Sequence, residues 1–437
     1  MKALAEVLHD RGWTLTGCDL DPDPLTAASL ERLGIHVETG QNEAHVSSDH
    51  SQLIHSAAIP REHPELVRAR ELGIVTRSYV EMLAAWSRER ATIAVAGTHG
   101  KSTTTAMLGT ILQSACLDPT VVCGAESLVR RRNGWAGDGS LFVVEACEYR
   151  RHFLSLQAHI ACLLGIEPDH FDCYTTFADS IAAYREFVTQ LPGDGTLIVN
   201  ADCPQAMDVA RATKSGLITF GLADSGELDW TASNLETVGF ETRFDLVRSG
   251  RSIGRVILCV PGQHNVLNAL AAAAAAASVG VSNEAILRGL SSFRGLKRRF
   301  EFVRKVGNSV FVDDYAHHPT EIRAALSTAR ITHPDHEVWC VFQPHQLSRT
   351  EKLFAEFTSA LELADRVFLL PVYAARETAG RQHAAISEFL ADSIGTRARA
   401  LGSLDQIWAS LQTDDDRPRV VLTLGAGNLN RVHHEFA

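Results

Sequence analysis

The chain has 437 residues, of which 45% are hydrophobic and 21% are charged, and its formal net charge is -11. This balance is typical of folded globular proteins and excludes the disordered and fibrous classes. An acidic chain is poorly suited to neutralising a nucleic-acid backbone, so we expect no nucleic-acid partner. The length favours about three domains.

The spacing of the cysteines and the length of the apolar segments indicate the cellular compartment. Nine cysteines occur and none belongs to a C-x-x-C pair, so the sequence contains neither a zinc-ribbon nor a redox motif. The alanine-rich stretch 270–281 is too short to span a membrane, and the N-terminus has no signal-peptide pattern. We therefore expect a cytoplasmic protein with reduced thiols and no membrane partner.

The first part of the chain alternates between helical and strand patterns: helices at 1–11 and 64–72, and strands at 13–18, 53–56 and 74–76. Such alternation predicts a parallel sheet flanked by helices. A polar, charged bridge at 87–90 follows. We predict a first domain over 1–88.

The middle of the chain predicts a second α/β unit, with strands at 92–96, 141–146, 160–164 and 196–199 and helices at 177–190 and 265–278. Short strand-like runs fill 229–260. The seven consecutive alanines Ala271–Ala277 predict a close helix-packing surface. We predict a second domain over 89–295.

A third α/β unit begins near Leu296, with strands at 309–313, 338–342, 366–370 and 420–424. The acidic run Asp414–Asp416 is interpreted as a solvated turn. We predict a third domain over 296–437, and hence an α/β fold of three domains in all.

The stretch that follows the 92–96 strand resembles a phosphate-binding loop. A G-x-x-x-x-G-K-[ST] loop needs a glycine at Val95, whereas this chain has it at Gly97, ahead of Gly100 and Lys101. A strand, a glycine turn and a helix start still favour phosphate, because free N–H groups and the helix dipole attract an anion. Ser102 or Thr103 could offer a hydroxyl to Mg²⁺. The alternative is a glycine-rich helix start with a solvated lysine.

Two other strands end in carboxylates or imidazole. Glu145 and Glu148 close the 141–146 strand, and His170 lies in a polar run after the 160–164 strand. Such groups at the carboxyl ends of parallel strands line the ligand crevice and could hold a hard divalent metal. Strand-end acids are also common as plain loop residues.

Asn265 and Asn268 are three residues apart and share one face of a helix start, where their amides could contact a purine or ribose. Helix capping by Asn265 is the alternative. Three further polar clusters, at 298–301, 313–319 and 342–350, lie at strand ends or a domain junction. They suggest a closing active site.

Together and in this order, these motifs resemble the Mur ligases, ATP-dependent enzymes that add amino acids to the UDP-sugar precursor of bacterial peptidoglycan. The resemblance rests on the runs at 97–105, 145–149 and 314–319 and covers nearly the whole chain. Within the family it is strongest to the branch that joins L-alanine to UDP-N-acetylmuramate.

The resemblance implies a fold and a set of site residues. It implies a Rossmann-like N-terminal domain, a central ATPase-type domain and a C-terminal Rossmann-like domain that closes on ATP. The implied ATP contacts are Gly97, Thr98, His99, Gly100, Lys101, Ser102, Thr103, Asn265, Asn268, Arg299 and Asp314. The implied catalytic residues are Lys101, Glu145, His170 and Arg299, and the implied Mg²⁺ ligands are Ser102, Glu145 and His170. Tyr315, His345 and Arg349 are implied to face the amino acid.

The implied reaction is phosphorylation of the lactyl carboxylate of UDP-N-acetylmuramate by ATP, followed by attack of the L-alanine amine. Such chemistry relies on positioning and charge neutralisation. The implied partners are small-molecule substrates only, and the oligomeric state stays open.

The chain departs from the family pattern in three places. The family opens with a strand and a glycine-rich turn, whereas this sequence begins in the helix that follows them, so we expect either a start assigned too late or a reduced UDP site. Gly165 stands where the branch has asparagine, and Gln346 where arginine is frequent.

Other functions stay open. One is the related ligase that reattaches a recycled tripeptide to UDP-N-acetylmuramate, and a less favoured one is a folylpolyglutamate-type ligase. From another class, the chain could be a non-catalytic protein that binds a nucleotide or a UDP-sugar.

Overall fold

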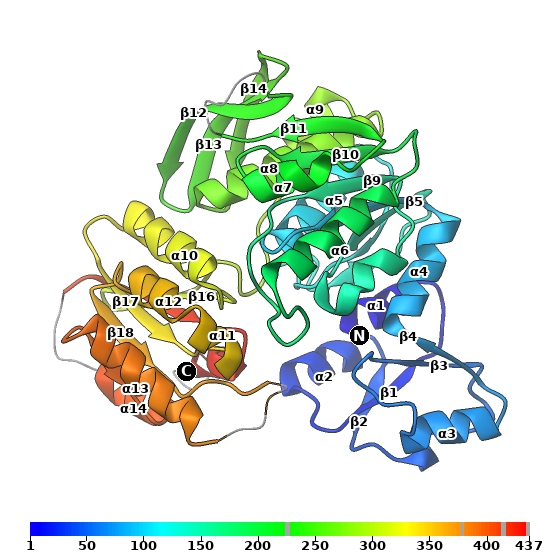
Figure 1. The fold of residues 1–437 in the computed structure, drawn as a ribbon, viewed down its shortest axis with the longest axis horizontal. Helices are drawn as coiled ribbons and strands as arrows, with labels where there is room; N and C mark the ends of the chain where they lie inside the picture. The colour runs from blue at the N-terminus through cyan, green and yellow to red at the C-terminus, as the bar shows by residue number, and fades with distance from the viewer. Residues whose placement is uncertain (223–227, 376, 378–379, 412–416, 434–437) are drawn as a thin grey trace.

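The computed structural model describes residues 1–222, 228–375, 377, 380–411 and 417–433. Three lobes follow one another along the chain, coloured from blue through green to red in Figure 1. The α/β fold class is confirmed. The predicted turn at Asp414–Asp416 lies outside the described residues.

The N-terminal lobe contains α1 (Lys2–Asp10), β1 (Thr16–Asp19), α2 (Pro24–Glu31), β2 (His36–Thr39), η1 (Glu43–His45), β3 (Gln52–His55), α3 (Pro64–Glu71), β4 (Val75–Ser78) and α4 (Tyr79–Glu89). In place of the single predicted sheet, its strands form two parallel pairs, β1 with β2 and β3 with β4. Helices still separate the strands of each pair, as expected for parallel connections.

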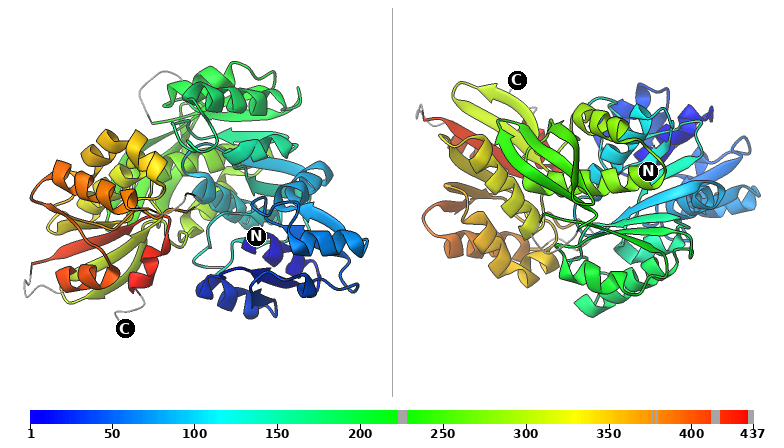
Figure 2. Two further views of the ribbon diagram at one scale, coloured as in Figure 1. Left: turned by 60° about the horizontal axis from the view of Figure 1, so that its bottom comes forward. Right: turned by 90° about the horizontal axis from the view of Figure 1, so that it is seen from above.

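Helix α1 is anchored to the central lobe. Leu4 and Val7 are buried in a core shared with strands of the central sheet. The buried Glu6 carboxylate accepts hydrogen bonds from the backbone N–H groups of Asn133 (2.7 Å) and Gly134 (2.8 Å). Figure 2 shows the N-terminal lobe lying against the central lobe in two further views.

The predicted polar bridge at 87–90 is wrong. Helix α4 continues to Glu89, and Ser87 is buried with its hydroxyl donating to the Ala84 carbonyl at 2.8 Å. Because a hydroxyl can satisfy itself on a carbonyl three residues earlier, a polar residue can stay inside a helix. The central sheet begins at Ala91, so only one residue separates the two elements.

The central lobe is built on a ten-stranded sheet in the order β14-β13-β12-β11-β10-β9-β5-β8-β6-β7 among the described residues. The strands are β5 (Ala91–Ala96), β6 (Thr120–Val122), β7 (Gly134–Trp135), β8 (Leu141–Glu145), β9 (Ile160–Leu163), β10 (Thr196–Asn200), β11 (Gly216–Phe220), β12 (Trp230–Val238), β13 (Glu241–Arg248) and β14 (Arg251–Leu258). Strand β5 runs parallel to β8 on one side and β9 on the other, so these three strands end at one edge.

Helices cover this sheet: α5 (Lys101–Ser114), η2 (Tyr149–Ser155), α6 (Phe177–Thr189), α7 (Pro204–Ala210), α8 (Gln263–Ser278) and α9 (Asn283–Ser292). The alanine run lies in α8, where Ala271–Ala276 are fully buried and the helix packs on α5. Small side chains let the two helices approach closely. The predicted packing surface is confirmed.

Among its described residues, the C-terminal lobe holds a six-stranded sheet in the order β15-β16-β20-β17-β18-β19. Its strands are β15 (Glu301–Val306), β16 (Ser309–Asp314), β17 (Glu337–Phe342), β18 (Arg366–Leu369), β19 (Ala398–Ala400) and β20 (Arg419–Leu424), and its helices are α10 (Pro319–Thr332), α11 (Leu347–Lys352), α12 (Phe354–Leu361), α13 (Gln382–Ile394), α14 (Leu404–Leu411) and η3 (Asn428–His433). Of the strands described in this sheet, only the edge strand β15 is antiparallel to its neighbour.

Within the described residues, no helix combines the length and the apolar character that crossing a membrane requires. All nine cysteines are free thiols. The predicted domain limits at residues 88 and 295 stay predictions.

Candidate active site

The glycine loop joins β5 to α5 at the edge where β5, β8 and β9 end. Gly97 has φ +134° and Gly100 has φ +81°, a left-handed region that glycine adopts without strain. A Cβ on Gly100 would lie 2.3 Å from Asn268 Oδ1, and one on Gly97 would lie 3.0 Å from the Gly165 backbone. Both glycines are therefore required by backbone conformation and by space.

Gly165 holds the glycine loop in place through its backbone. The Thr98 N–H donates to the Gly165 carbonyl at 2.8 Å, and the Glu167 N–H donates to the Thr98 hydroxyl at 2.9 Å. These bonds tie the glycine loop to the segment that follows β9. The loop is thus fixed to this segment as well as to the start of α5.

Lys101 is the first residue of α5, and its ammonium lies in a buried polar cluster. Its Nζ donates to the carbonyls of Gly97 (2.6 Å) and Thr98 (3.1 Å) and to Glu148 Oε1 (3.0 Å). The same Glu148 oxygen lies 3.2 Å from His170 Nε2. Predicted site residues from two strand ends and the glycine loop therefore meet at one carboxylate.

Burial and the opposite charge of the partner shift the pKa values of Lys101 and Glu148 in opposite directions. Burial alone would lower the pKa of Lys101 and raise that of Glu148, but the attraction between the two groups prevails. The pKa of Lys101 is raised by Glu148, and the pKa of Glu148 is lowered by Lys101 and His170. The pair is consequently ionised at neutral pH.

Ser102 and Glu145 form a second contact beside the first. The Ser102 hydroxyl donates to Glu145 Oε2 at 2.8 Å, and the Gly124 N–H donates to the same oxygen at 2.7 Å. His170, the third predicted metal ligand, contacts Glu148 and not Glu145. Its Nδ1 is buried without a hydrogen-bond partner among the described residues.

Helix α8 brings the two predicted asparagines to the loop. Asn268 Nδ2 donates to Asn265 Oδ1 at 3.2 Å, and the Thr104 hydroxyl donates to Asn268 Oδ1 at 3.3 Å. Helix α8 begins at Gln263, and Asn265 Nδ2 donates to the Pro261 carbonyl at 2.7 Å. The alternative role of Asn265 as a side-chain cap is therefore wrong.

The C-terminal lobe supplies Arg299 and Asp314 to the same place. The Asp314 carboxylate accepts from the N–H groups of Phe300 and Ala316, each at 2.7 Å. Burial raises the pKa of Asp314 to about 6, while Arg299 opposes this shift. Burial would lower the pKa of Arg299, but Glu321 and Asp314 raise it. Arg299 is therefore a permanent cation.

These groups surround a cavity of about 460 Å³ between the glycine loop, α8 and α10. Seven of the predicted ATP contacts line it: His99, Gly100, Thr103, Asn265, Asn268, Arg299 and Asp314. The volume lies within the range of small-molecule sites. The remaining four, Gly97, Thr98, Lys101 and Ser102, belong to the same loop and helix start.

His99 connects the loop to the C-terminal lobe. Its Nδ1 lies 3.0 Å from Glu321 Oε1, and its Nε2 lies 3.5 Å from Glu167 Oε2. Burial would lower the pKa of His99, but Glu321 and Glu167 raise it to about 9. The imidazolium thus bridges carboxylates of two lobes.

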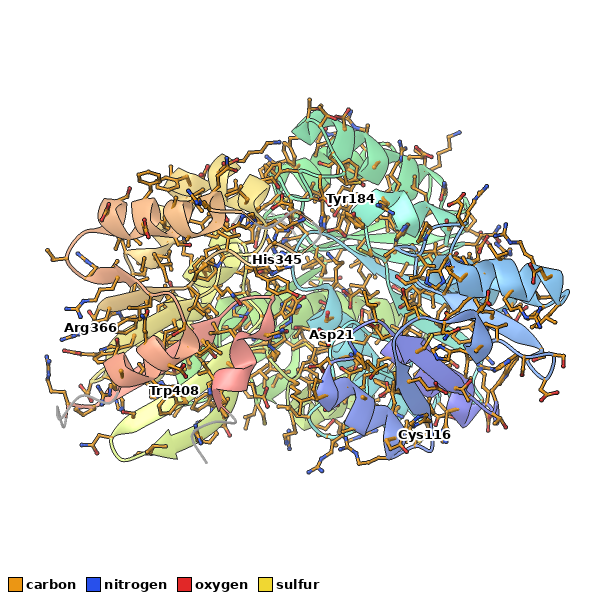
Figure 3. All side chains as sticks on the ribbon, turned by 90° about the horizontal axis from the view of Figure 1, so that it is seen from below. Asp21, Cys116, Tyr184, His345, Arg366 and Trp408 are labelled. Carbon is orange, nitrogen blue, oxygen red and sulfur yellow. The ribbon has the colours of Figure 1, made fainter. Side chains whose placement is uncertain are left out.

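The three predicted amino-acid contacts lie around His317. The ring centroid of His317 lies 5.4 Å from that of Tyr315 and 5.8 Å from that of His345, and the Arg349 guanidinium lies 3.2 Å from His345 Nδ1. Figure 3 labels His345 near the middle of the molecule, on the side of the C-terminal lobe that faces the central lobe. The three residues form one cluster.

Arg349 is also engaged by the central lobe. The Asp169 Oδ1 atom lies 2.7 Å from Arg349 Nη2 and 2.8 Å from Nε. Gln346, which replaces the frequent arginine, is buried at the start of α11, and its Nε2 has no hydrogen-bond partner among the described residues.

Sequence reasoning missed several polar groups of the site. Glu321, His264, Asn200 and Asp202 line the cavity. His318 lies within the predicted cluster at 313–319, but its contact with the central lobe, with Nδ1 3.5 Å from Glu167 Oε2, was not predicted. Two signals were available. Asn200 is the last residue of a strand and Asp202 follows it, and His318 with Glu321 has the spacing of a capping box, which the structure contains.

Comparison with known protein families identifies the family to which this fold and site belong. Residues 1–91 match the family described as "Mur ligase family, catalytic domain", residues 95–276 match "Mur ligase middle domain", and residues 298–427 match "Mur ligase, glutamate ligase domain". The chain belongs to the Mur ligase family.

Individual relatives are similar over the full length. The UDP-N-acetylmuramate–L-alanine ligase of Desulfitobacterium hafniense (strain Y51) is 40% identical over 437 residues, which are 99% of this chain and 96% of the relative. The crystal structure of UDP-N-acetylmuramate-alanine ligase from Thermotoga maritima matches with a TM-score of 0.82 and 26% identity, over 100% of this chain and 95% of the other. A murein peptide ligase from Psychrobacter arcticus matches with a TM-score of 0.75 and 26% identity, over 99% and 95%.

Proposed function

We propose that this protein joins L-alanine to UDP-N-acetylmuramate in peptidoglycan precursor synthesis and converts ATP to ADP and phosphate. The observation that carries the proposal is one cavity lined by the glycine loop, α8 and the C-terminal lobe, in a chain that is similar throughout to ligases named for this reaction. The proposal implies a cytoplasmic enzyme, because ATP is supplied there.

Positive charge around the cavity suits the first step. An oxygen of the lactyl carboxylate attacks the γ-phosphorus of ATP, the bond to the β-phosphate oxygen breaks, and ADP leaves. Lys101 comes from the central lobe and Arg299 from the C-terminal lobe, and both are cations at neutral pH. Their role is to hold the phosphates and to offset the charge of the transition state.

The second step needs an amine beside the acyl phosphate. The nitrogen of L-alanine attacks the carbonyl carbon, phosphate leaves with one oxygen of the original carboxylate, the nitrogen gives up a proton to solvent, and an amide remains. Arg349 carries the charge that suits the alanine carboxylate, His345 contacts it, and Tyr315 is linked to His345 through the ring of His317. We assign these three residues to the amino-acid site.

The hydroxyl and carboxylate oxygens beside the loop fit Mg²⁺, which prefers hard oxygen ligands. Ser102 and Glu145 would hold it, since they already meet at 2.8 Å. His170 contacts Glu148 through Nε2, so its Nδ1, which has no hydrogen-bond partner among the described residues, is the atom that could face the ion. When bound, the ion would neutralise phosphate charge and polarise the γ-phosphoryl group.

A peptide in place of L-alanine is the second candidate, because the fold is also similar to that of a murein peptide ligase. A larger substrate would need more room beside Arg349. A cavity of about 390 Å³ borders Asp169, Phe171 and Lys352 on that side.

Phosphate release with ATP, Mg²⁺ and UDP-N-acetylmuramate tests these functions. We expect release that depends on L-alanine and stops when the metal is chelated. Faster release with the tripeptide than with L-alanine would favour the recycling reaction. Nucleotide binding without release under any amino acid or peptide would favour a non-catalytic binding protein.

A further inference from the structure

Three metal-ligating side chains meet in the N-terminal lobe, and none of them lines the ATP cavity. Cys18 Sγ lies 3.1 Å from Glu65 Oε1, and His45 Nδ1 lies 3.1 Å from the same oxygen. One ligand atom from each residue lies within 4.8 Å of the other two. The three groups are separated by at least 20 residues in the sequence, so the fold brings them together.

The backbone holds the cluster from several elements. Cys18 belongs to β1, His45 ends η1 and Glu65 lies in the first turn of α3. The Asn42 N–H donates to Glu65 Oε1 at 3.0 Å, while the Asn42 side chain caps η1 through the Ala44 N–H. Because α3 packs on η1 and β4, the cluster joins the β1–β2 pair to the elements of the β3–β4 pair.

A fourth residue orients the histidine. Glu38 Oε2, from β2, lies 3.1 Å from His45 Nε2, on the ring edge opposite Glu65. In metal sites, the ring nitrogen that does not bind the metal typically donates to a carboxylate, which fixes the tautomer. His45 has this arrangement, with Nδ1 directed at Glu65.

The spacing suits a small tetrahedral ion. Zinc lies about 2.3 Å from sulfur and about 2.0–2.2 Å from nitrogen or oxygen, so its ligand atoms are about 3.2–3.7 Å apart. The two distances of 3.1 Å in the cluster need only a small expansion. A thiol with an imidazole and a carboxylate favours zinc-class ions over Mg²⁺. All three residues are partly exposed, which gives an ion access.

We propose that Cys18, His45 and Glu65 bind one zinc-class divalent ion, with Glu38 as a positioning residue and solvent at the fourth position. On binding, the Cys18 S–H bond breaks, its proton passes to the buffer, and the sulfur lone pair joins the metal. The ion fastens β1 to α3 and so ties the two strand pairs of the N-terminal lobe together.

Cobalt titration of the full chain tests the site, with Co²⁺ as the probe and a non-thiol reductant present. We expect one Co²⁺ per chain, with a thiolate-to-cobalt absorption band and the visible bands of a tetrahedral ion. Equimolar Zn²⁺ abolishes both, whereas a hundredfold excess of Mg²⁺ does not. Cys18→Ser removes the thiolate band. Cys116→Ser, at an exposed cysteine outside the cluster, keeps it.

Two further variants distinguish a loss of metal binding from a loss of folding. Circular dichroism checks the fold of each protein. Glu38→Gln keeps the thiolate band and binds Co²⁺ about 10- to 100-fold more weakly. Glu65→Gln weakens binding further. The proposal is overturned if the thiolate band persists in Cys18→Ser. It is also overturned if the wild-type protein shows no such band at millimolar Co²⁺. Neither readout depends on ligase activity.

Discussion

The carboxylate of Asp169 and the guanidinium of Arg349 link the central lobe to the C-terminal lobe, with Oδ1 2.7 Å from Nη2 and 2.8 Å from Nε. Burial would raise the pKa of Asp169, but Arg349 lowers it well below its usual range. Arg349 therefore has two functions. It joins the lobes, and it belongs to the amino-acid cluster.

Arg349→Lys tests whether the positive charge alone is sufficient or whether the planar guanidinium group is needed. Lysine keeps one positive charge but cannot bind a carboxylate through two N–H groups. We expect the KM for L-alanine to rise at least tenfold while the Kd for ATP is unchanged. Steady-state kinetics and nucleotide titration measure the two values. The matched control is Arg366→Lys, at the exposed start of β18. Equal KM values for L-alanine in the two variants would show that Arg349 does not belong to the amino-acid site.

Lys101→Ala removes the cation of the glycine loop. A charge pair at about 4 Å and an effective dielectric of about 20 contributes about 4 kcal/mol, which corresponds to about a 1000-fold loss of kcat/KM. Lys305→Ala, at an exposed position in β15, keeps full activity. The phosphate-release assay compares them, with circular dichroism to check the fold. Wild-type kcat/KM in Lys101→Ala contradicts the assigned role.

Gly100→Ala tests whether the loop needs both its backbone angle and its space. The added methyl would lie 2.3 Å from Asn268 Oδ1 at φ +81°, so we expect nucleotide affinity to fall at least tenfold. Gly307→Ala is the control, because Gly307 has φ +56° and nothing within 4 Å of a Cβ. It bears only the backbone strain, about 1–3 kcal/mol. Equal ATP affinities in the two variants would show that the loop tolerates a side chain.

The His99 contact predicts a pH dependence. The pKa of His99 is raised to about 9, so its ion pairs stabilise the folded protein fully below the usual pKa of about 6.5 and are lost as the pH rises through 9. We expect the difference in urea midpoint between wild type and His99→Gln to be constant from pH 5.5 to 6 and to shrink between pH 7 and 10. Other titrating groups cancel in the difference. A difference that does not change with pH excludes a protonated His99.

Local features of the site were predictable from sequence, and tertiary contacts were not. The loop at Gly97–Lys101 follows an apolar strand and precedes a helix, so its chemistry depends on residues that are adjacent in the chain. His99 and Glu321 are 222 residues apart, and their contact depends on how two lobes dock. Single-sequence patterns carry no information about that docking.

In the N-terminal lobe, one feature was misread locally and another depends on strand pairing. The charged residues beside Ser87 suggest a linker, but the Ser87 hydroxyl is satisfied inside α4, and the helix persists. Strand β2 (His36–Thr39) is short and polar, with three of its four residues exposed. It lacks the apolar alternation by which strands are recognised, because its stability comes from pairing with β1.

Oxygen transfer from the sugar carboxylate tests the proposed ligation most directly. UDP-N-acetylmuramate labelled with ¹⁸O in the lactyl carboxylate is incubated with ATP, Mg²⁺ and L-alanine, and product and phosphate are analysed by mass spectrometry. We expect a product heavier by one alanine residue and one ¹⁸O atom in each phosphate released. Phosphate without ¹⁸O, or phosphate release without an alanine-containing product, would contradict the proposed ligation.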